Sequence, residues 1–276
     1  MSIFQAIILG AVQGITEFLP VSSSGHLVLF QRIFGVSEPA LFFDTMVHVG
    51  TLAAVFAVLW QDIWGILRRI IQPLTFHLIL ATIPAVIFAL LFKDSVEKAF
   101  SSGSFLGFAF LITSALLVMS ELLSKKAGKP GGPAVSGAGG TGRNDMKWPD
   151  ALIIGLLQAA AIIPGVSRSG STLSGALSRG LNRDFAARFS FLLSIPAILG
   201  ALVLQIRDLT ADAAGTGGIG AAPLVAGTLT AALVGFFSIR LMLKIVRERS
   251  LTGFAVYTGI LGVLVLVDRF GTHWFF

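Results

Sequence analysis

Apolar residues fill most of this chain, without the regular polar face of a soluble helix. Six uncharged segments each approach the roughly 20 residues that a helix needs to cross the hydrocarbon core of a membrane. They are 45–61, 74–92, 105–120, 189–206, 213–239 and 250–267. The pattern therefore predicts an all-α polytopic membrane protein with six transmembrane helices.

Two further apolar stretches, 1–31 and 151–178, are interrupted by proline and by clusters of serine and glycine. Pro20 breaks the first stretch and Pro164 the second, so neither predicts one straight helix. We interpret them as two re-entrant helical hairpins, whose irregular turns line a wet cavity or are buried in protein. The alternative is eight ordinary spans, two of them kinked by proline.

The two halves of the chain resemble each other. At a shift of 145 positions, Gly10, Gln13, Val21, Ser22, Ser24 and Gly25 coincide with Gly155, Gln158, Val166, Ser167, Ser169 and Gly170. Residues 127–147 are rich in glycine and proline and read as a flexible linker. The sequence thus predicts a first repeat over 1–126 and a second over 148–276, each with one hairpin and three crossings.

Charge sets the expected orientation of these repeats. Charged residues are only 12% of the chain, and mean hydropathy is +0.87. Most of the basic residues gather in a few loops, which the positive-inside rule places in the cytoplasm. These groups are Arg68-Arg69, Lys125 to Lys147, Arg179/Arg183/Arg188 and Lys244/Arg247/Arg249. Three crossings per half then invert the second repeat, so the two hairpins enter from opposite faces and both termini lie outside, with the linker cytoplasmic.

The same charge distribution limits the classes of partner and chemistry. The net charge of +6 is explained by loops that orient the protein in a membrane, so no nucleic-acid partner is needed. The chain has no cysteine, which excludes disulfides and cysteine-based metal sites. Small residues in the apolar segments permit close helix contacts, either in a homodimer or within one subunit. Those we single out are Gly200, Ala201, Gly227 and Gly235.

The first interrupted stretch carries acid–base chemistry. Gln13 and Glu17 are four residues apart and share one helix face. An ionisable group inside a membrane is functional by default, although Glu17 at an exposed interface is the plainer alternative. Directly after it, the run from Pro20 to His26 supplies three serine hydroxyls and an imidazole. We interpret this turn as a nucleophile next to a base.

The second stretch carries phosphate-binding chemistry. Its turn runs from Pro164 to Thr172 and places Arg168 at the position equivalent to Ser23. An arginine fork and neighbouring hydroxyl and N–H donors suit a phosphate or diphosphate. Ser167, Ser169 and Thr172 are the candidate hydroxyl donors. The alternative is a structural arginine paired with Glu17.

The segments Gln13–His26 and Pro164–Thr172 resemble the two signatures of the bacterial undecaprenyl-diphosphate phosphatases, the bacitracin-resistance proteins. Further matches are Phe43–Thr51 and Ala186–Pro196. The resemblance implies an enzyme of the bacterial cytoplasmic membrane. Such an enzyme removes the terminal phosphate of a polyprenyl diphosphate and so recycles the carrier lipid for cell-wall synthesis.

Carried over by position, the resemblance makes Glu17 the essential carboxylate, Ser23 the nucleophile, His26 the acid–base residue and Arg168 the phosphate clamp. Ser22, Ser167, Ser169 and Thr172 would be supporting donors. His26 as the nucleophile, or as the activator of water, remains open because both groups lie in one turn.

The family resemblance also implies a divalent cation, Mg²⁺ or Ca²⁺. Glu17 would hold it, together with water and substrate oxygens, and Gln13 is the second candidate ligand. Gln13 stands where many members carry a second glutamate, and Arg188 stands where a glutamate is common. The glutamine weakens any two-carboxylate metal site.

Two other functions compete with this interpretation. A type-2 phosphatidic-acid phosphatase uses similar segments, but it needs a second histidine after the Ser-Arg motif, and only His273 follows Arg168. A transporter or flippase of a lipid phosphate would have the same inverted-repeat architecture. A carrier needs binding groups but no nucleophile, and this difference favours the hydrolase.

Overall fold

The computed structural model describes residues 1–36, 41–92, 105–126, 146–211 and 219–274, together with positions 95, 96 and 98. Regular structure in these ranges is helical, as the sequence predicts. The helices are α1 Ile3–Thr16, α2 Ser23–Ile33, α3 Leu41–Val58, α4 Trp60–Arg68, α5 Pro73–Leu91, α7 Leu106–Lys126, α8 Trp148–Ala160, α9 Arg168–Ser178, α10 Arg183–Ala211, α11 Ala221–Glu248 and α12 Thr252–Val267, which ends in the short π-helix η2 Asp268–Thr272. The predicted linker 127–147 lies almost wholly outside the described residues.

Long apolar helices confirm a protein that crosses the membrane several times. In the part of the chain that is described, α5, α7, α10, α11 and α12 are long and apolar enough to span a membrane. A sixth span results if α3 and α4 are counted as one bent crossing. The predicted span 213–239 is displaced, because α11 runs from Ala221 to Glu248 and residues 212–218 are not described.

The predicted straight span 45–61 is wrong at its end, because α3 and α4 meet at 77° around Leu59. The composition changes at this point. The helix α4 is amphipathic, and Trp60 stacks on Trp64, with ring centroids 5.7 Å apart. The Arg68 guanidinium lies 5.0 Å from the centre of the Trp64 ring. Exposed tryptophans beside arginine are typical of a helix that lies in the membrane interface, so α4 turns away where the apolar segment ends.

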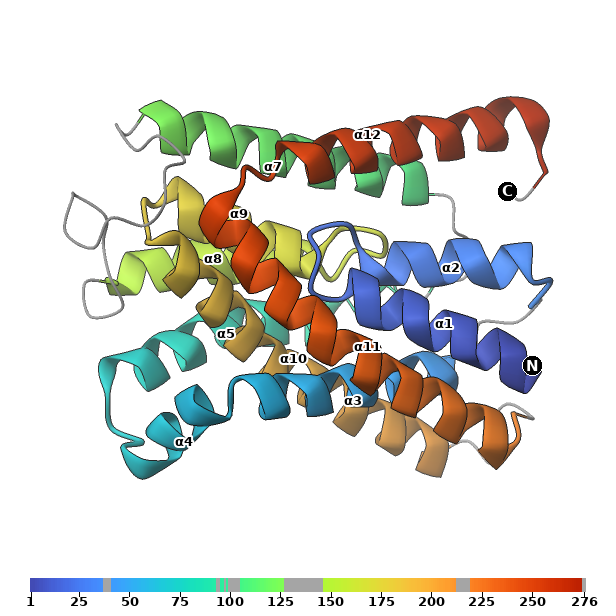
Figure 1. Cartoon of the computed structure of the whole chain (residues 1–276), viewed down its shortest axis with the longest axis horizontal. Coiled ribbons are helices and arrows are strands. Elements are labelled where there is room, and N and C mark those ends of the chain that lie inside the picture. The colour runs from blue at the N-terminus through green and yellow to red at the C-terminus, as the bar shows by residue number, and fades with distance from the viewer. Residues whose placement is uncertain are drawn as a thin grey trace.

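Each interrupted stretch forms two short helices that fold back on each other. In Figure 1, α1 runs inward from the end of the molecule that holds the N-terminus, and α2 returns to that end. The pair α8 and α9 enters from the opposite end and returns there. The two turns meet in the interior, which is the arrangement that positions the site.

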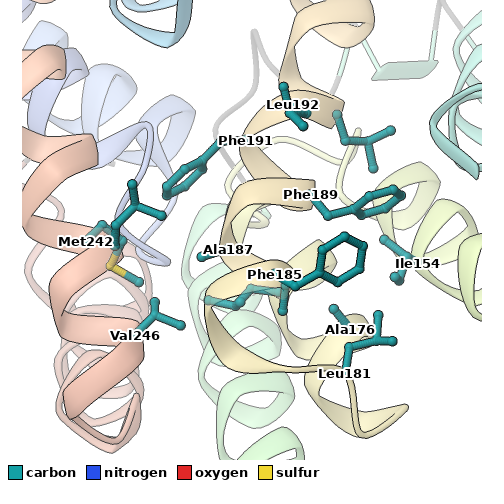
Figure 2. Packing of buried hydrophobic residues seen from close by; sticks show 14 of the residues in the cluster. Ile154, Ala176, Leu181, Phe185, Ala187, Phe189, Phe191, Leu192, Met242 and Val246 are labelled. Atoms are coloured by element: carbon teal, nitrogen blue, oxygen red, sulfur yellow. The ribbon is translucent and has the colours of Figure 1, made fainter. Parts of the chain in front are cut away.

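The large apolar core lies around α10. Figure 2 shows Phe189 and Phe185 of α10 facing Ile154 of α8, while Phe191 lies toward Met242 of α11. All five side chains belong to one cluster of buried residues. The core therefore fixes α10 between the second hairpin and α11.

Glycines allow α11 to lie directly against α1 and α3. A Cβ atom at Gly10 would collide with the carbonyl of Gly227, and one at Gly14 would lie 2.8 Å from the nitrogen of Gly235. A Cβ atom at Gly50 of α3 would collide with the carbonyl of Thr228. Gly227 and Gly235, which we had considered for a dimer contact, are therefore used within one subunit.

Ion pairs connect neighbouring helices at the end of the molecule where α8 and α10 begin and α11 ends. The pairs are Arg179–Asp150 at 2.7 Å, Arg183–Glu121 at 2.8 Å, Arg188–Asp62 at 2.8 Å and Arg247–Asp184 at 2.6 Å. Arg188, which departs from the family pattern, thus connects α10 to the interfacial helix α4. The arginines that the sequence assigns to one face do gather at one end of the fold.

Candidate active site

The turn of the first hairpin presents Glu17 and Ser23 on either side of a sharp bend. Glu17 directly follows α1, and its backbone N–H still donates to Gln13. Ser22 caps α2: its hydroxyl accepts from the N–H of Gly25 at 3.2 Å. The φ angle of Ser22 is +72°, a left-handed conformation that is strained for serine and is common at functional turns. This bend makes Ser23 the first residue of α2.

The turn of the second hairpin repeats this construction with an arginine. Gly165 has φ of +87°, a conformation that glycine adopts without strain. Ser167 caps α9 by accepting from the N–H of Gly170 at 3.0 Å. Arg168 is consequently the first residue of α9, as Ser23 is the first residue of α2.

Hydrogen bonds between the two turns fix their relative position. The N–H of Gly165 donates to the Ser24 hydroxyl at 3.3 Å, and the Ser169 hydroxyl donates to the carbonyl of Leu19 at 3.0 Å. The site therefore exists only in the folded contact between the two halves of the chain.

The carboxylate of Glu17 lies at the centre of the site. Its Oε1 atom accepts from Nη2 of Arg168 at 2.5 Å, and its Oε2 atom accepts from the Ser23 hydroxyl at 2.5 Å. Oε2 also accepts from Nε2 of Gln13 at 3.0 Å, and Nε2 of His48 lies 3.5 Å away. The Glu17 side chain is only 5% exposed, so the alternative of a glutamate at an exposed interface is wrong.

The guanidinium of Arg168 has a second anchor besides Glu17. Its Nη1 atom donates to the carbonyl of Ser190 at 3.1 Å. The ion pair of Arg168 with Glu17, which is the structural alternative for this arginine, is therefore present. The arginine nevertheless lines a cavity and keeps 16% of its side chain exposed, so its remaining N–H groups are open to a ligand.

His26 does not join Ser23 in the arrangement that the sequence led us to expect. Its Nδ1 atom lies 2.7 Å from the carbonyl oxygen of Ser22, and its Nε2 atom lies 2.7 Å from the hydroxyl of Tyr257 in α12. The ring stacks on Tyr257 and meets Phe110 edge-on. Both ring nitrogens are therefore used away from the cavity, and the base nearest to the Ser23 hydroxyl is Glu17.

The other predicted donors brace the turns rather than line the cavity. Ser22 and Ser167 are the helix caps described above, and Ser169 is bonded to Leu19. The Thr172 hydroxyl lies 2.6 Å from that of Ser190. Because these hydroxyls are engaged within the protein, they act on the site by holding Ser23 and Arg168 in place.

A cavity of about 340 Å³ opens beside the carboxylate. Its polar lining residues are Glu17, Ser23, Ser24, Asp44, Thr45, His48 and Arg168, and its apolar lining residues are Leu27, Ala161, Ile162, Val166, Ala197, Ile198 and Ala201. Sequence analysis missed Ser24, Asp44 and His48. Asp44 and His48 lie in the segment Phe43–Thr51 that resembles the family. This resemblance is the feature of the sequence that could have identified them as residues of the site. A lining that combines charged and hydroxyl side chains with apolar ones suits an amphipathic ligand.

The predicted cation site at Glu17 and Gln13 does not fit this arrangement. Gln13 turns its N–H group, not its oxygen, toward Glu17. Both oxygens of Glu17 already accept from donors, one of which is a guanidinium. Among the described residues, no three histidine, aspartate or glutamate side chains converge in a way that could hold a metal. A divalent cation prefers several free oxygen ligands, so Mg²⁺ or Ca²⁺ would have to displace Arg168 or Ser23 here.

Comparison with known proteins gives the family. Residues 6–264 match the family described as bacitracin resistance protein BacA. The undecaprenyl-diphosphatase of Carboxydothermus hydrogenoformans is 45% identical over 267 residues, 97% of each chain. An undecaprenyl-diphosphatase of Methanosphaera stadtmanae is 40% identical over 97% of this chain, and undecaprenyl-diphosphatase 3 of Bacillus cereus is 42% identical over 98%. The chain belongs to the BacA family of undecaprenyl-diphosphatases.

Proposed function

We propose that this protein hydrolyses undecaprenyl diphosphate to undecaprenyl phosphate and inorganic phosphate in the cavity between the two hairpin turns. Its family is one of membrane hydrolases, and its relatives carry the name of this activity. The observation that carries the assignment to this cavity is the contact of Glu17 with both Ser23 and Arg168. The reaction returns the carrier lipid to cell-wall synthesis, which accounts for bacitracin resistance.

The reaction begins with the terminal phosphate held by the free N–H groups of Arg168. The Ser23 oxygen attacks the phosphorus while its proton moves to Oε2 of Glu17, which already accepts from that hydroxyl. The bond to the bridging oxygen breaks, and its electron pair leaves with the lipid phosphate. Arginine stabilises the charge on the transferred phosphoryl group, and positioning supplies most of the remaining catalysis.

The apolar side chains of the cavity receive the first isoprene units of the substrate. They include Ala197, Ile198 and Ala201 of α10 and Ile162 and Val166 of the second turn. The volume of this cavity holds a diphosphate and the beginning of a prenyl chain but not a C55 lipid. The rest of the chain therefore extends into the bilayer.

The two hairpins are re-entrant in this proposal, and the halves are inverted repeats. Helices of 14 and 13 residues, such as α1 and α8, reach only about 20 Å, which is less than the hydrocarbon thickness. A shift of 145 positions carries the bounds of α2 onto those of α9. A shift of 146 carries the start of α7 onto the start of α12. These correspondences support repeats over 1–126 and 148–276.

Transport of a lipid phosphate would use the same architecture but not the same contacts. A carrier gains nothing from a serine hydroxyl held 2.5 Å from a buried carboxylate. This contact favours hydrolysis over the flippase alternative.

Phosphate release by the purified protein tests the proposal. Ser23→Ala leaves Arg168 in place, so the lipid diphosphate should still bind while turnover falls by about 10³-fold or more. Ser174→Ala is the matched control, because its buried hydroxyl has no partner among the described residues and does not line the cavity. It should keep normal turnover. Hydrolysis by Ser23→Ala at the unaltered rate would show that another group, with His26 the next candidate, attacks the phosphorus.

A further inference from the structure

His48 is a titratable side chain of the cavity to which the reaction above gives no role. It comes from the middle of α3, an element that contributes neither hairpin turn. Its side chain is 28% exposed, the highest fraction among the ionisable groups that contact Glu17, and it lines the cavity. The imidazole is therefore open to a substrate or to water.

Hydrogen bonding fixes the tautomer of His48. Its Nδ1 atom lies 2.6 Å from the backbone carbonyl oxygen of Asp44. A carbonyl oxygen only accepts, so Nδ1 carries the proton. In the neutral ring Nε2 is then an unprotonated nitrogen with a free lone pair. This is the atom that faces Glu17 and the cavity.

The groups around Nε2 leave the lone pair available. Glu17 lies at 3.5 Å, beyond a hydrogen bond, and Arg168 is turned to the other carboxylate oxygen. The carboxylate of Asp44, on the same helix, accepts from Nε2 of Gln31 at 2.6 Å. His26 cannot act in its place, because both of its nitrogens are engaged outside the cavity.

The second half of the reaction needs a base other than Glu17. Once Ser23 has been phosphorylated, Glu17 holds the proton that it took from the serine. It must return this proton to the serine oxygen when the phosphoserine bond breaks. Glu17 therefore cannot also accept a proton from the attacking water.

We propose that His48 is the general base for hydrolysis of the phosphoserine at Ser23, an inference that rests on the function proposed above. The water oxygen attacks the phosphorus as one of its protons moves to Nε2 of His48. The bond from phosphorus to the serine oxygen breaks, and that oxygen recovers its proton from Glu17. The resulting imidazolium is held beside the restored carboxylate of Glu17, and it gives its proton to the departing phosphate or to solvent.

Trapping of the phosphoenzyme tests this role. Loss of a general base lowers a rate by about 10²-fold or more, so His48→Gln should lower the turnover number by that factor. KM should fall with it, because kcat/KM reports the unaltered attack by Ser23. Attack by Ser23 stays intact, so phosphoserine should accumulate and be detected by mass spectrometry of acid-quenched protein. His77→Gln is the matched control, since His77 is a buried histidine of α5 outside the cavity. It should retain turnover and show no accumulation.

Chemical rescue provides a second variant that does not depend on the glutamine. His48→Ala leaves space beside the cavity, and added imidazole should restore a large part of the turnover. A fall in turnover without phosphoserine, or without rescue, would make His48 structural and overturn the inference. Unchanged turnover in both variants would also overturn it. Failure of the serine mechanism itself is seen separately, as full activity of Ser23→Ala.

Discussion

At the scale of single residues, Glu17 shows how one buried carboxylate gathers polar side chains from three parts of the chain. Gln13 and Ser23 contact it from the first hairpin, Arg168 from the second, and His48 from α3. A buried charge is costly unless it is paired and hydrogen-bonded, and here both conditions are met. The same contacts that stabilise the ionised carboxylate align it with the serine hydroxyl.

The planar fork of Arg168 can be tested without removing its charge. Arg168→Lys keeps a cation, but one ammonium group cannot hold Ser190, Glu17 and a phosphate in the fixed geometry of the fork. We expect turnover to fall by about tenfold or more while the protein still inserts and folds, as measured by phosphate release and thermal unfolding. Arg179→Lys is the matched control, because that arginine pairs with Asp150 away from the cavity. Equal turnover in the two variants would reduce Arg168 to a structural role.

The sequence predicts that Glu17, Ser23 and Arg168 belong to one site, because the internal repeat places their turns at equivalent positions. It did not predict the direction of the His26 ring. That direction depends on Tyr257, which is remote in sequence, and on the left-handed backbone of Ser22. It also gave no role to His48, because a lone histidine in an apolar helix has no local pattern that reveals its neighbours.

At the scale of helices, the glycines of α1 and α11 control how the first hairpin is held. The helix α1 carries Gln13 and leads directly to Glu17, so its depth against α11 sets the position of the carboxylate. Gly10 and Gly14 contact the backbone of α11 with no room for a side chain. Close packing of this kind replaces the hydrophobic driving force that is missing between helices in lipid.

Gly10→Ala tests this packing. The added methyl group meets the carbonyl of Gly227, which is backbone and cannot rotate away. We expect a loss of about 1–3 kcal/mol or more in the free energy of unfolding, measured in detergent, with lower turnover. Gly200→Ala is the control, because a Cβ atom there has no atom of the described part of the chain within 4 Å. Alanine favours a helix over glycine, so this change should be neutral or slightly stabilising.

Hairpin helices were easier to predict than the bend between α3 and α4. Prolines and serine–glycine clusters mark the hairpin turns locally, and the repeat confirms each turn by the other. The bend at Leu59 lies at the end of an apolar run and has no proline beside it. It results from the change to an amphipathic helix and from the ion pair of Asp62 with Arg188 on α10, a tertiary contact that the local sequence does not contain.

At the scale of the whole molecule, both termini lie at one end and α4 at the other. The ion-pair network of Arg179, Arg183, Arg188 and Arg247 lies at the α4 end, with the last residues of α11. An excess of arginine and lysine favours the cytoplasm, so this end is expected to face inward.

Cysteine labelling in this cysteine-free chain tests the orientation. Ile71→Cys and Glu248→Cys should react with a membrane-impermeant maleimide only after the cytoplasmic side is opened. Ser2→Cys and Thr272→Cys should react in intact cells or spheroplasts. The unaltered protein, which has no thiol, is the blank. Labelling of Glu248→Cys and Thr272→Cys from the same side would contradict a single crossing by α12 and the inverted arrangement.

In the resting enzyme, the carboxylate of Glu17 competes with phosphate for the guanidinium of Arg168. An anion that enters the cavity must draw the guanidinium partly away from a carboxylate that already neutralises it. A diphosphate attached to a long lipid offsets this cost through contacts with the apolar residues of the cavity, whereas inorganic phosphate makes no such contacts. When the lipid phosphate and then the inorganic phosphate have left, the carboxylate recovers its arginine and the cavity does not retain the product. The contact between the two halves at rest thereby also weakens the binding of inorganic phosphate and limits inhibition by this product.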